Sequence, residues 1–191
     1  MELTPLQKYA EEVLAELPSV VRSLAILGGG ALRAFFDGTV VKDYDLFFAS
    51  NEDYETAIAE MFHSSTDGDW SYHGESGRTV EFKSPSGMTF NLIGFAFGTA
   101  EDHAEAFDFR CCQIVAWWNP IELLVDTYAT EGAIEEATRR ILTVVNNNGT
   151  DRTEERITRY SQVYGYVVNL EGFENVKRYL ESKPVTQRGS Y

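Results

Sequence analysis

The sequence predicts an α+β domain, with a mixed sheet and flanking helices followed by a helical C-terminal part. Its 191 residues are 43% hydrophobic, which is enough to bury a core without disulfide or metal staples. Short apolar runs bounded by glycines and polar turns fill residues 23–97 and indicate strands. The helical pattern returns beyond Asn119-Pro120. We therefore expect a sheet-rich core over residues 1–118 and a helical region over residues 119–191.

Composition limits the location and the partners of the protein. There are 16 Lys and Arg against 30 Asp and Glu, giving a formal net charge of −14. This charge argues against binding nucleic acid by bulk charge alone, because affinity for the phosphate backbone comes from Lys and Arg. No window reaches the ~18 apolar residues of a membrane span, and the polar N-terminus is not typical of a signal peptide. Adjacent Cys111 and Cys112 lie in an apolar run, so we expect buried thiols and a cytoplasmic protein.

Local signals place the elements in order. Thr4 and Gln7 form a capping box that opens the first helix, and Ser50 and Thr99 are placed to cap two later ones. Glycine- and proline-containing turns separate the apolar runs that predict strands. Residues 107–118 are ambiguous between helix and strand. The predicted elements are a helix over 4–17, strand 23–27, helix 31–36, strand 40–49, helix 51–63, a loop over 64–78 with room for a short strand, a β-hairpin over 79–97, helix 99–107, helix 130–141, a strand-like run over 142–146, and helices over 150–168 and 173–182.

A glycine triplet begins the stretch that carries the chemistry. A predicted buried strand ends in Gly28, Gly29 and Gly30, and a helix begins there. A helix N-terminus presents unpaired N–H groups and the positive end of its dipole, and glycines let the backbone approach an anion closely. Arg33 lies one turn into the helix, where it could steady a phosphate or brace the loop. Taken alone, the triplet could simply form a tight turn between the strand and the helix. The functional prediction is that this turn binds a phosphate.

Two carboxylates follow on the next predicted strand. Positions i and i+2 of a strand point to the same face, so Asp43 and Asp45 project side by side, roughly 7 Å apart at Cα. Their repulsion raises the pKa of each, and a divalent cation such as Mg²⁺ removes that cost. A solvated strand face is the alternative for an acidic pair alone. Together with the preceding glycines, the pair indicates metal-assisted phosphoryl or nucleotidyl transfer.

These residues carry a resemblance to a known superfamily. The stretch 27–48 reads LGGGALRAFFDGTVVKDYDLFF and resembles the nucleotidyltransferase signature of the DNA polymerase β superfamily. It is most similar to the head domain of class II tRNA CCA-adding enzymes and bacterial poly(A) polymerases, with their GG-x-x-R-D and D-x-D-L patterns. Asp108-Phe109 match that family's R-D-F-T-x-N-A motif, and residues 155–159 resemble part of its E-D-x-x-R-x-x-R helix. The resemblance covers residues 23–168 and is strongest over 27–48.

The resemblance implies a nucleotidyltransferase-type fold with a helical neck over residues 119–191. It implies that Asp43 and Asp45 bind Mg²⁺, and that the glycines 28–30 and Arg33 hold the triphosphate of an NTP. In the implied reaction an acceptor hydroxyl attacks the α-phosphate and pyrophosphate is released. The acceptor is an RNA 3′ end such as that of tRNA, a protein side chain or a small molecule.

The sequence departs from the family pattern at several motif positions. Ala34, Phe107 and Cys112 stand where the family has Asp, Arg and Asn. In the family, the E-D-x-x-R-x-x-R helix helps to select CTP and ATP. Here Arg152-Thr153 stand in place of its Glu-Asp pair, so we expect no ordered addition of C, C and A.

The expected third carboxylate is also replaced. The best-aligned strand position holds Asn91, which cannot accept a proton at neutral pH. Glu81 lies on the facing strand of the predicted hairpin and is our candidate for the base. Two alternatives to an enzyme stay open: a catalytically degenerate nucleotide-binding module, and an interaction protein such as the antitoxin half of a pair. An acidic surface would suit a basic partner in the latter.

Overall fold

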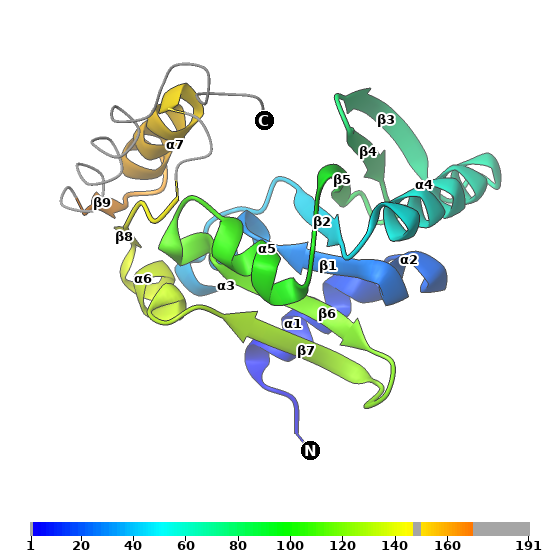
Figure 1. The fold of residues 1–191 in the computed structure, drawn as a ribbon, viewed down its shortest axis with the longest axis horizontal. Coiled ribbons are helices and arrows are strands. Elements are labelled where there is room, and N and C mark those ends of the chain that lie inside the picture. The colour runs from blue at the N-terminus through cyan, green and yellow to red at the C-terminus, as the bar shows by residue number, and fades with distance from the viewer. Residues whose placement is uncertain (1, 147–149, 170–191) are drawn as a thin grey trace.

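The computed structural model describes residues 2–146 and 150–169 and contains a seven-stranded mixed sheet with helices on both faces (Figure 1). The strand order is β3-β4-β5-β2-β1-β6-β7, in which the β2–β5 pair is parallel and the other pairs are antiparallel. The strands are β1 Ala25–Gly28, β2 Tyr44–Phe48, β3 Ser71–Ser76, β4 Thr79–Lys83, β5 Thr89–Phe97, β6 Ile114–Asn119 and β7 Leu124–Ala129, with a separate parallel pair of β8 Ile141–Leu142 and β9 Val167–Val168.

Helices flank the sheet, as the sequence predicts for an α+β fold. They are α1 Pro5–Ala15, α2 Ser19–Leu24, α3 Gly30–Asp37, α4 Asn51–Thr66, α5 Ala100–Ala106, α6 Ala133–Arg139 and α7 Thr150–Gln162, with one 3₁₀ turn at Arg110–Cys112. The predicted fold class is therefore confirmed.

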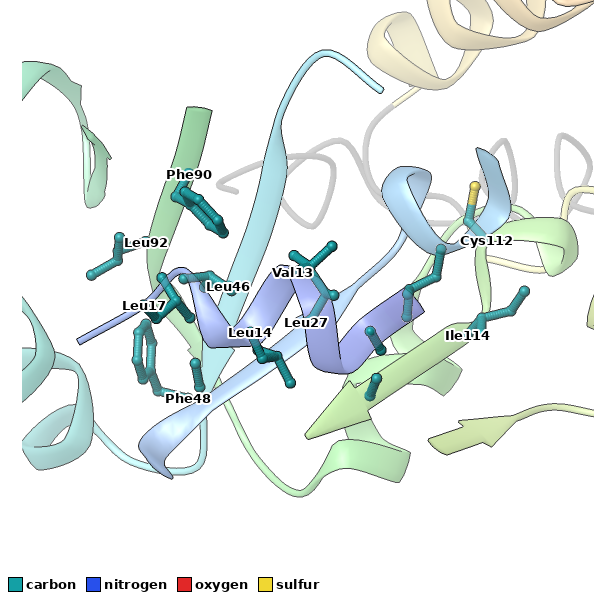
Figure 2. Close-up of a cluster of buried hydrophobic side chains, with 14 of the residues drawn as sticks. Val13, Leu14, Leu17, Leu27, Leu46, Phe48, Phe90, Leu92, Cys112 and Ile114 are labelled. Atoms are coloured by element: carbon teal, nitrogen blue, oxygen red, sulfur yellow. The ribbon is translucent and has the colours of Figure 1, made fainter. Parts of the chain in front are cut away.

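The two faces of the sheet are covered differently. Leu27, Leu46 and Phe48 point to one face and pack with the buried side chains of α1 and α4 in the main core (Figure 2). Ile26 and Val115 point to the other face and pack against the small residues of α5. Helix α5 lies on β1, β6 and β7. On that face the neighbouring strands β2, β5 and β4 instead carry polar, partly exposed side chains, and these form the candidate site.

The first helix begins as predicted. The Thr4 hydroxyl accepts the Gln7 amide at 3.2 Å, and the Gln7 side chain accepts the Thr4 amide at 2.9 Å. Gln7 also donates from Nε2 to the Val125 carbonyl of β7 at 2.8 Å, which ties the helix to the edge of the sheet. The capping box therefore fixes both the start of α1 and its docking.

The chain beyond Asn119 is a correction to the prediction of helix. Asn119 Oδ1 accepts the amides of Ile121 and Glu122, and this turn sends the chain back as strand β7. Strand formation outweighs the local preference for helix there, because β6 offers an unpaired edge and Val125 can be buried against α1. The division at residue 118 stays a prediction, and β7 lies beyond it in the same sheet.

Several boundaries also differ from the predictions. The short strand for which the predicted loop over 64–78 has room is present as edge strand β3, and the ambiguous run over 107–118 becomes the 3₁₀ turn followed by β6. The last described helix ends at Gln162 rather than near residue 168, because Gly165, at φ 72°, turns the chain into β9. The predicted helix over 173–182 lies outside the described residues.

The two cysteines are buried, as the sequence predicts. Cys111 and Cys112 are free and buried. In the part of the chain that the structure describes, none of the helices combines the length and apolar character needed to cross a membrane.

Gly94 provides a test of the packing between β5 and α4. A Cβ atom at this position would overlap the ring of Tyr54. We expect Gly94→Ala to lower the free energy of unfolding by about 1–3 kcal/mol, because the buried ring has to move. Gly30→Ala is the matched control, since nothing lies within 4 Å of its added Cβ. Urea unfolding compares the two, and equal stability of both variants would contradict the packing described.

Candidate functional site

The glycine turn links the end of β1 to the start of α3. Gly29 has a φ of 74°, which favours glycine, and its carbonyl accepts the Arg33 amide at 3.1 Å. A Cβ at Gly28 would lie 2.9 Å from the ring of Phe107, so this glycine permits close packing of that ring. Gly30 has open space where a Cβ would stand. The turn is thus covered by an aromatic ring on one side and open at the first residue of the helix.

One row of paired residues crosses the strands beside this turn. Gly28 pairs with Asp45, Asp45 with Asn91, and Asn91 with Glu81. Residues directly opposite one another on neighbouring strands point to the same face of a sheet. The register therefore places the predicted groups Asp45, Asn91 and Glu81 in line on the polar face.

The pKa of the Asp45 carboxyl is shifted from its ordinary value. Asp45 is partly buried, and its Oδ1 accepts the side-chain amide of Asn91 at 3.0 Å. Burial raises its pKa above the ordinary value, and the negative charge of Asp43 raises it further. The hydrogen bond from Asn91 and the charge of Arg156 act in the opposite direction without cancelling the shift. Asp45 is therefore a carboxylate that a cation would stabilise.

Asp43 lies just before the first residue of β2 and is exposed. The prediction of two carboxylates within one strand thus holds for Asp45 alone, although the two charges still interact. Within the described residues no three His, Cys, Asp or Glu side chains come together as a metal cluster. Two carboxylates suit Mg²⁺, which completes its shell with water and substrate phosphates.

Glu81 lies two strands away from Asp45, at roughly 10 Å between Cα atoms from the spacing of strands. Its side chain is 44% exposed, and its Oε1 lies 3.9 Å from Nδ1 of His73 on β3. The sequence placed Glu81 and Asn91 on facing strands of one hairpin, and β4 and β5 pair in that way. The structure thus brings Glu81 to the same face as the aspartate, separated from it by Asn91.

A cation reaches this face from α7. Arg156 donates from a terminal nitrogen to Oδ2 of buried Asp108 at 2.7 Å and lies over the ring of Phe109. Burial raises the pKa of Asp108, and the charge of Arg156 partly offsets this. Arg156 also acts electrostatically on Asp45. In the sequence, the signal for Arg156 is its match to the first arginine of the E-D-x-x-R-x-x-R helix in the resembling family.

Arg33 lies inside the protein rather than at the open side of the glycine turn. It is 4% exposed and forms an ion pair with Asp37. Its guanidinium lies 4.9 Å and 4.8 Å from the ring centres of Tyr160 and Tyr164. Of the two roles expected from the sequence, this placement suits bracing of the turn better than contact with a phosphate.

Two surface hollows lie elsewhere on the molecule. One, of about 310 Å³, includes Trp117, Trp118 and Thr99, and another, of about 510 Å³, includes Arg110 and Glu131. Neither contains Asp45 or the glycine turn. The candidate site is therefore defined by its strand register and its charges.

Known structures share this fold. A tRNA-processing enzyme in an apo form superposes with a TM-score of 0.65 at 14% identity, over 95% of this chain and 48% of that one. The Thermotoga maritima CCA-adding enzyme complexed with tRNA gives 0.59 at 16% identity, over 94% and 43% of the two chains. A tRNA nucleotidyltransferase with a primer tRNA and an ATP analogue gives 0.61 at 14% identity, over 92% and 50%. The chain spans about half the length of these structures, and its fold is of the polymerase β-like nucleotidyltransferase type.

The family is identified by a separate comparison. The family model described as Gabija anti-defense 2 family protein matches residues 5–137, which include the glycine turn and every strand of the main sheet. The chain belongs to the Gabija anti-defense 2 family. Comparison with curated proteins gives no match.

The raised pKa of Asp45 yields a test of the site's electrostatics. An acid whose pKa is raised in the folded state destabilises the fold when ionised, and this cost vanishes as pH falls towards its unfolded pKa. We expect Asp45→Asn to stabilise the metal-free protein at pH 8 by on the order of 1 kcal/mol, and by less at pH 4. Asp67→Asn, at an exposed position, is the control. Urea unfolding at both pH values measures the difference, and a gain independent of pH would contradict the assignment.

Proposed function

We propose that this protein is a Mg²⁺-dependent nucleotidyltransferase that moves an NMP from an NTP to an acceptor hydroxyl and releases pyrophosphate. The observation that carries the proposal is the pairing of Gly28 with Asp45. It sets a partly buried carboxylate with a raised pKa directly beside a glycine turn that opens a helix. A phosphate-binding turn next to a metal-binding carboxylate is the arrangement that this reaction requires.

Asp43 and Asp45 are the residues proposed to hold the cation. When bound, Mg²⁺ would neutralise charge on the phosphates and polarise the α-phosphate. The residues present fit this ion, because Oδ2 of Asp45 has no hydrogen-bond partner among the described residues and Asp43 adds a second oxygen donor. Gly30 is proposed to meet the triphosphate through its backbone amide, whereas the amide of Gly29 donates to the carbonyl of Ile114 at 3.2 Å. Arg156 is proposed to add positive charge from α7.

Glu81 is proposed to take up the proton of the acceptor. As the acceptor oxygen forms a bond to the α-phosphorus, the bond from that phosphorus to the bridging oxygen breaks and pyrophosphate leaves with its electron pair. The hydroxyl proton passes to the Glu81 carboxylate. The spacing of two strands between Glu81 and Asp45 leaves room for an acceptor above Asn91.

The anti-defence description of the family supplies a biological setting for the proposed transfer. We propose that the acceptor is a protein or RNA whose modification weakens the Gabija defence. Candidate acceptors include an RNA 3′ end such as that of tRNA, because two solved structures with this fold hold a bound tRNA. The net charge of −14 favours a basic protein or small-molecule acceptor over an RNA gripped by this segment alone.

A binding module without catalysis is the second candidate. Asn91 occupies the middle of the carboxylate row and donates to Asp45. Phe107 lies on the glycine turn, where the resembling family has an arginine. These two observations favour a protein that acts on the defence system by binding, as an antitoxin binds its toxin.

Transfer of label tests the enzyme directly. The protein is incubated with each α-labelled NTP, Mg²⁺ and lysate of cells with or without the Gabija system. We expect label on one species, and at least a hundredfold loss in Asp43→Asn and Asp45→Asn, because each removes a proposed metal ligand. Asp67→Asn is the matched control for loss of one exposed charge. Absence of label with every NTP, together with an unchanged melting temperature in Mg²⁺ and NTP, would favour the binding module.

The third carboxyl position separates an active enzyme from a relic. We expect Glu81→Gln to abolish transfer, because the acceptor proton then has no base, and Asn91→Asp to raise it. Glu75→Gln, on the neighbouring edge strand, is the control. The rates are measured with the species that takes up label in the transfer experiment. Activity unchanged in Glu81→Gln would contradict its role, and activity gained only in Asn91→Asp would indicate a relic.

A further inference from the structure

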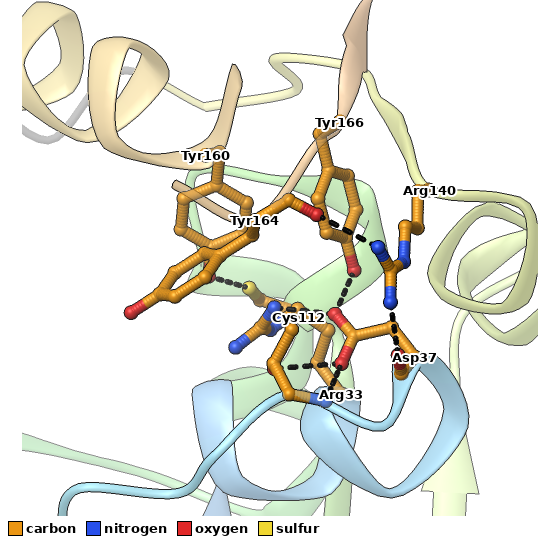
Figure 3. A network of polar contacts seen from close by, with 8 residues as sticks. Arg33, Asp37, Cys112, Arg140, Tyr160, Tyr164 and Tyr166 are labelled. Carbon is orange, nitrogen blue, oxygen red and sulfur yellow. Dashed lines mark hydrogen bonds and ion pairs between the residues drawn. The ribbon is translucent and has the colours of Figure 1, made fainter. Parts of the chain in front are cut away.

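Arg33 is held in a cage contributed by the C-terminal part of the described chain. Tyr160, Tyr164 and Tyr166 each lie with a ring centre 4.8–5.7 Å from its guanidinium carbon (Figure 3). Asp37 forms an ion pair with the same guanidinium and accepts a hydrogen bond from the Tyr166 hydroxyl at 2.6 Å. Helix α3 and the segment from α7 to β9 are therefore joined through one buried cation. We refer to these five residues as the Arg33 cage.

A second arginine, Arg140, connects the same two segments through hydrogen bonds to their backbone carbonyls. Arg140 ends α6 in the left-handed region, at φ 55°, which is uncommon for a residue with a side chain. Its guanidinium donates to the carbonyl of Asp37 at 2.6 Å and to the carbonyl of Tyr164 at 3.2 Å (Figure 3). Its own carbonyl accepts the amide of Val167 at 2.8 Å. The strained residue thus sits where α3, α6 and β9 meet.

The cage is coupled to the candidate site through α7. Tyr160 of the cage and Arg156 are four residues apart on this helix and so lie on one face of it. Arg156 reaches Asp108 and acts on Asp45, as described above. The position of the arginine at the site therefore depends on where α7 rests on α3.

We infer that Arg33 is a positioning residue: its cage docks α7 on α3 and so holds Arg156 on Asp108, which follows the Phe107 whose ring covers the glycine turn, and there the arginine meets the bound NTP. The role for NTP rests on the proposed function, whereas the docking of α7 does not. The sequence expectation that Arg33 itself binds phosphate is then unnecessary.

The physical chemistry favours a strong and specific join. A buried guanidinium is costly unless it is paired, and Asp37 supplies the opposite charge. Burial raises the pKa of Tyr166 above its ordinary value, and its bond to Asp37 adds to this, so the hydroxyl remains a donor at neutral pH. Cation–π contacts are stronger when they are desolvated, and three rings share this cation. A lysine cannot reproduce both the planar stacking and the ion pair.

Hydrogen exchange of the intact protein tests the docking of α7. We expect Arg33→Met to lower protection of the amides of residues 154–162 on the order of tenfold to a hundredfold, with β1 and β6 unchanged. Arg139→Met is the matched control, because Arg139 pairs with Glu135 on the surface of α6. If Arg33→Met does not fold, Tyr164→Leu replaces it, since this ring is only partly buried. Unchanged protection of α7 in the folded variant overturns the inference.

Nucleotide affinity tests the positioning of Arg156. With Mg²⁺ and the NTP used by the wild type, we expect Arg33→Met to raise KM on the order of tenfold with kcat within about twofold. Arg33→Lys should restore little of this loss. If Arg33 acts through Arg156, the double variant with Arg156→Met should bind NTP no more weakly than Arg156→Met alone. Additive losses would overturn the positioning role.

The hydrogen-exchange and nucleotide-affinity experiments together distinguish failure of this inference from failure of the proposed function. A wild type that neither binds nor turns over any NTP defeats the proposed function. Loss of α7 protection in Arg33→Met still supports the docking in that case, and unchanged protection still overturns it.

Discussion

The register of the central strands is the constraint on which the site depends. Gly28, Asp45, Asn91 and Glu81 form one row across β1, β2, β5 and β4. A slip of one residue in any of these pairs would turn a polar side chain into the main core and an apolar one out to solvent. Leu27, Leu46 and Leu92 and their neighbours, buried on the opposite face, prevent that slip. The hydrophobic core thus sets the alignment of the polar row from the opposite face of the sheet.

Positive charge reaches this face by an indirect route. The arginine in the glycine-led helix, Arg33, is turned inward, and the motif position before Asp108 carries the ring of Phe107. Among the groups that act on Asp45, the cation is Arg156 of α7. The electrostatics of the site therefore depend on the packing of the C-terminal segment, in which Tyr160 and Tyr166 are buried. This separates the groups that carry negative charge, on the sheet, from the group that carries positive charge, on a docked helix.

The sequence predicts much of this arrangement and misses specific parts for physical reasons. Local signals suffice for the capping box at Thr4, the hairpin of β4 and β5, and the glycine turn, because each is decided by residues close in the chain. Strand β7 was missed because its pairing with β6 is decided by an open sheet edge rather than by local preference. The inward turn of Arg33 was not foreseen because its partners Tyr160 and Tyr166 lie more than a hundred residues away. The roles of Asp43, Asp45 and Glu81 remain predictions.

The join between Asp37 and Tyr166 spans 129 residues of chain, which has a consequence for the order of events during synthesis. The strands that carry the polar row leave the ribosome well before the tyrosines that enclose Arg33. Contacts between distant residues form late, since the chain between them must first be closed into a loop. A nascent chain that ends before residue 156 therefore holds Arg33 without its aromatic partners and Asp45 without Arg156. During synthesis the growing chain therefore contains every strand of the main sheet before it contains the arginine and tyrosines of the C-terminal segment.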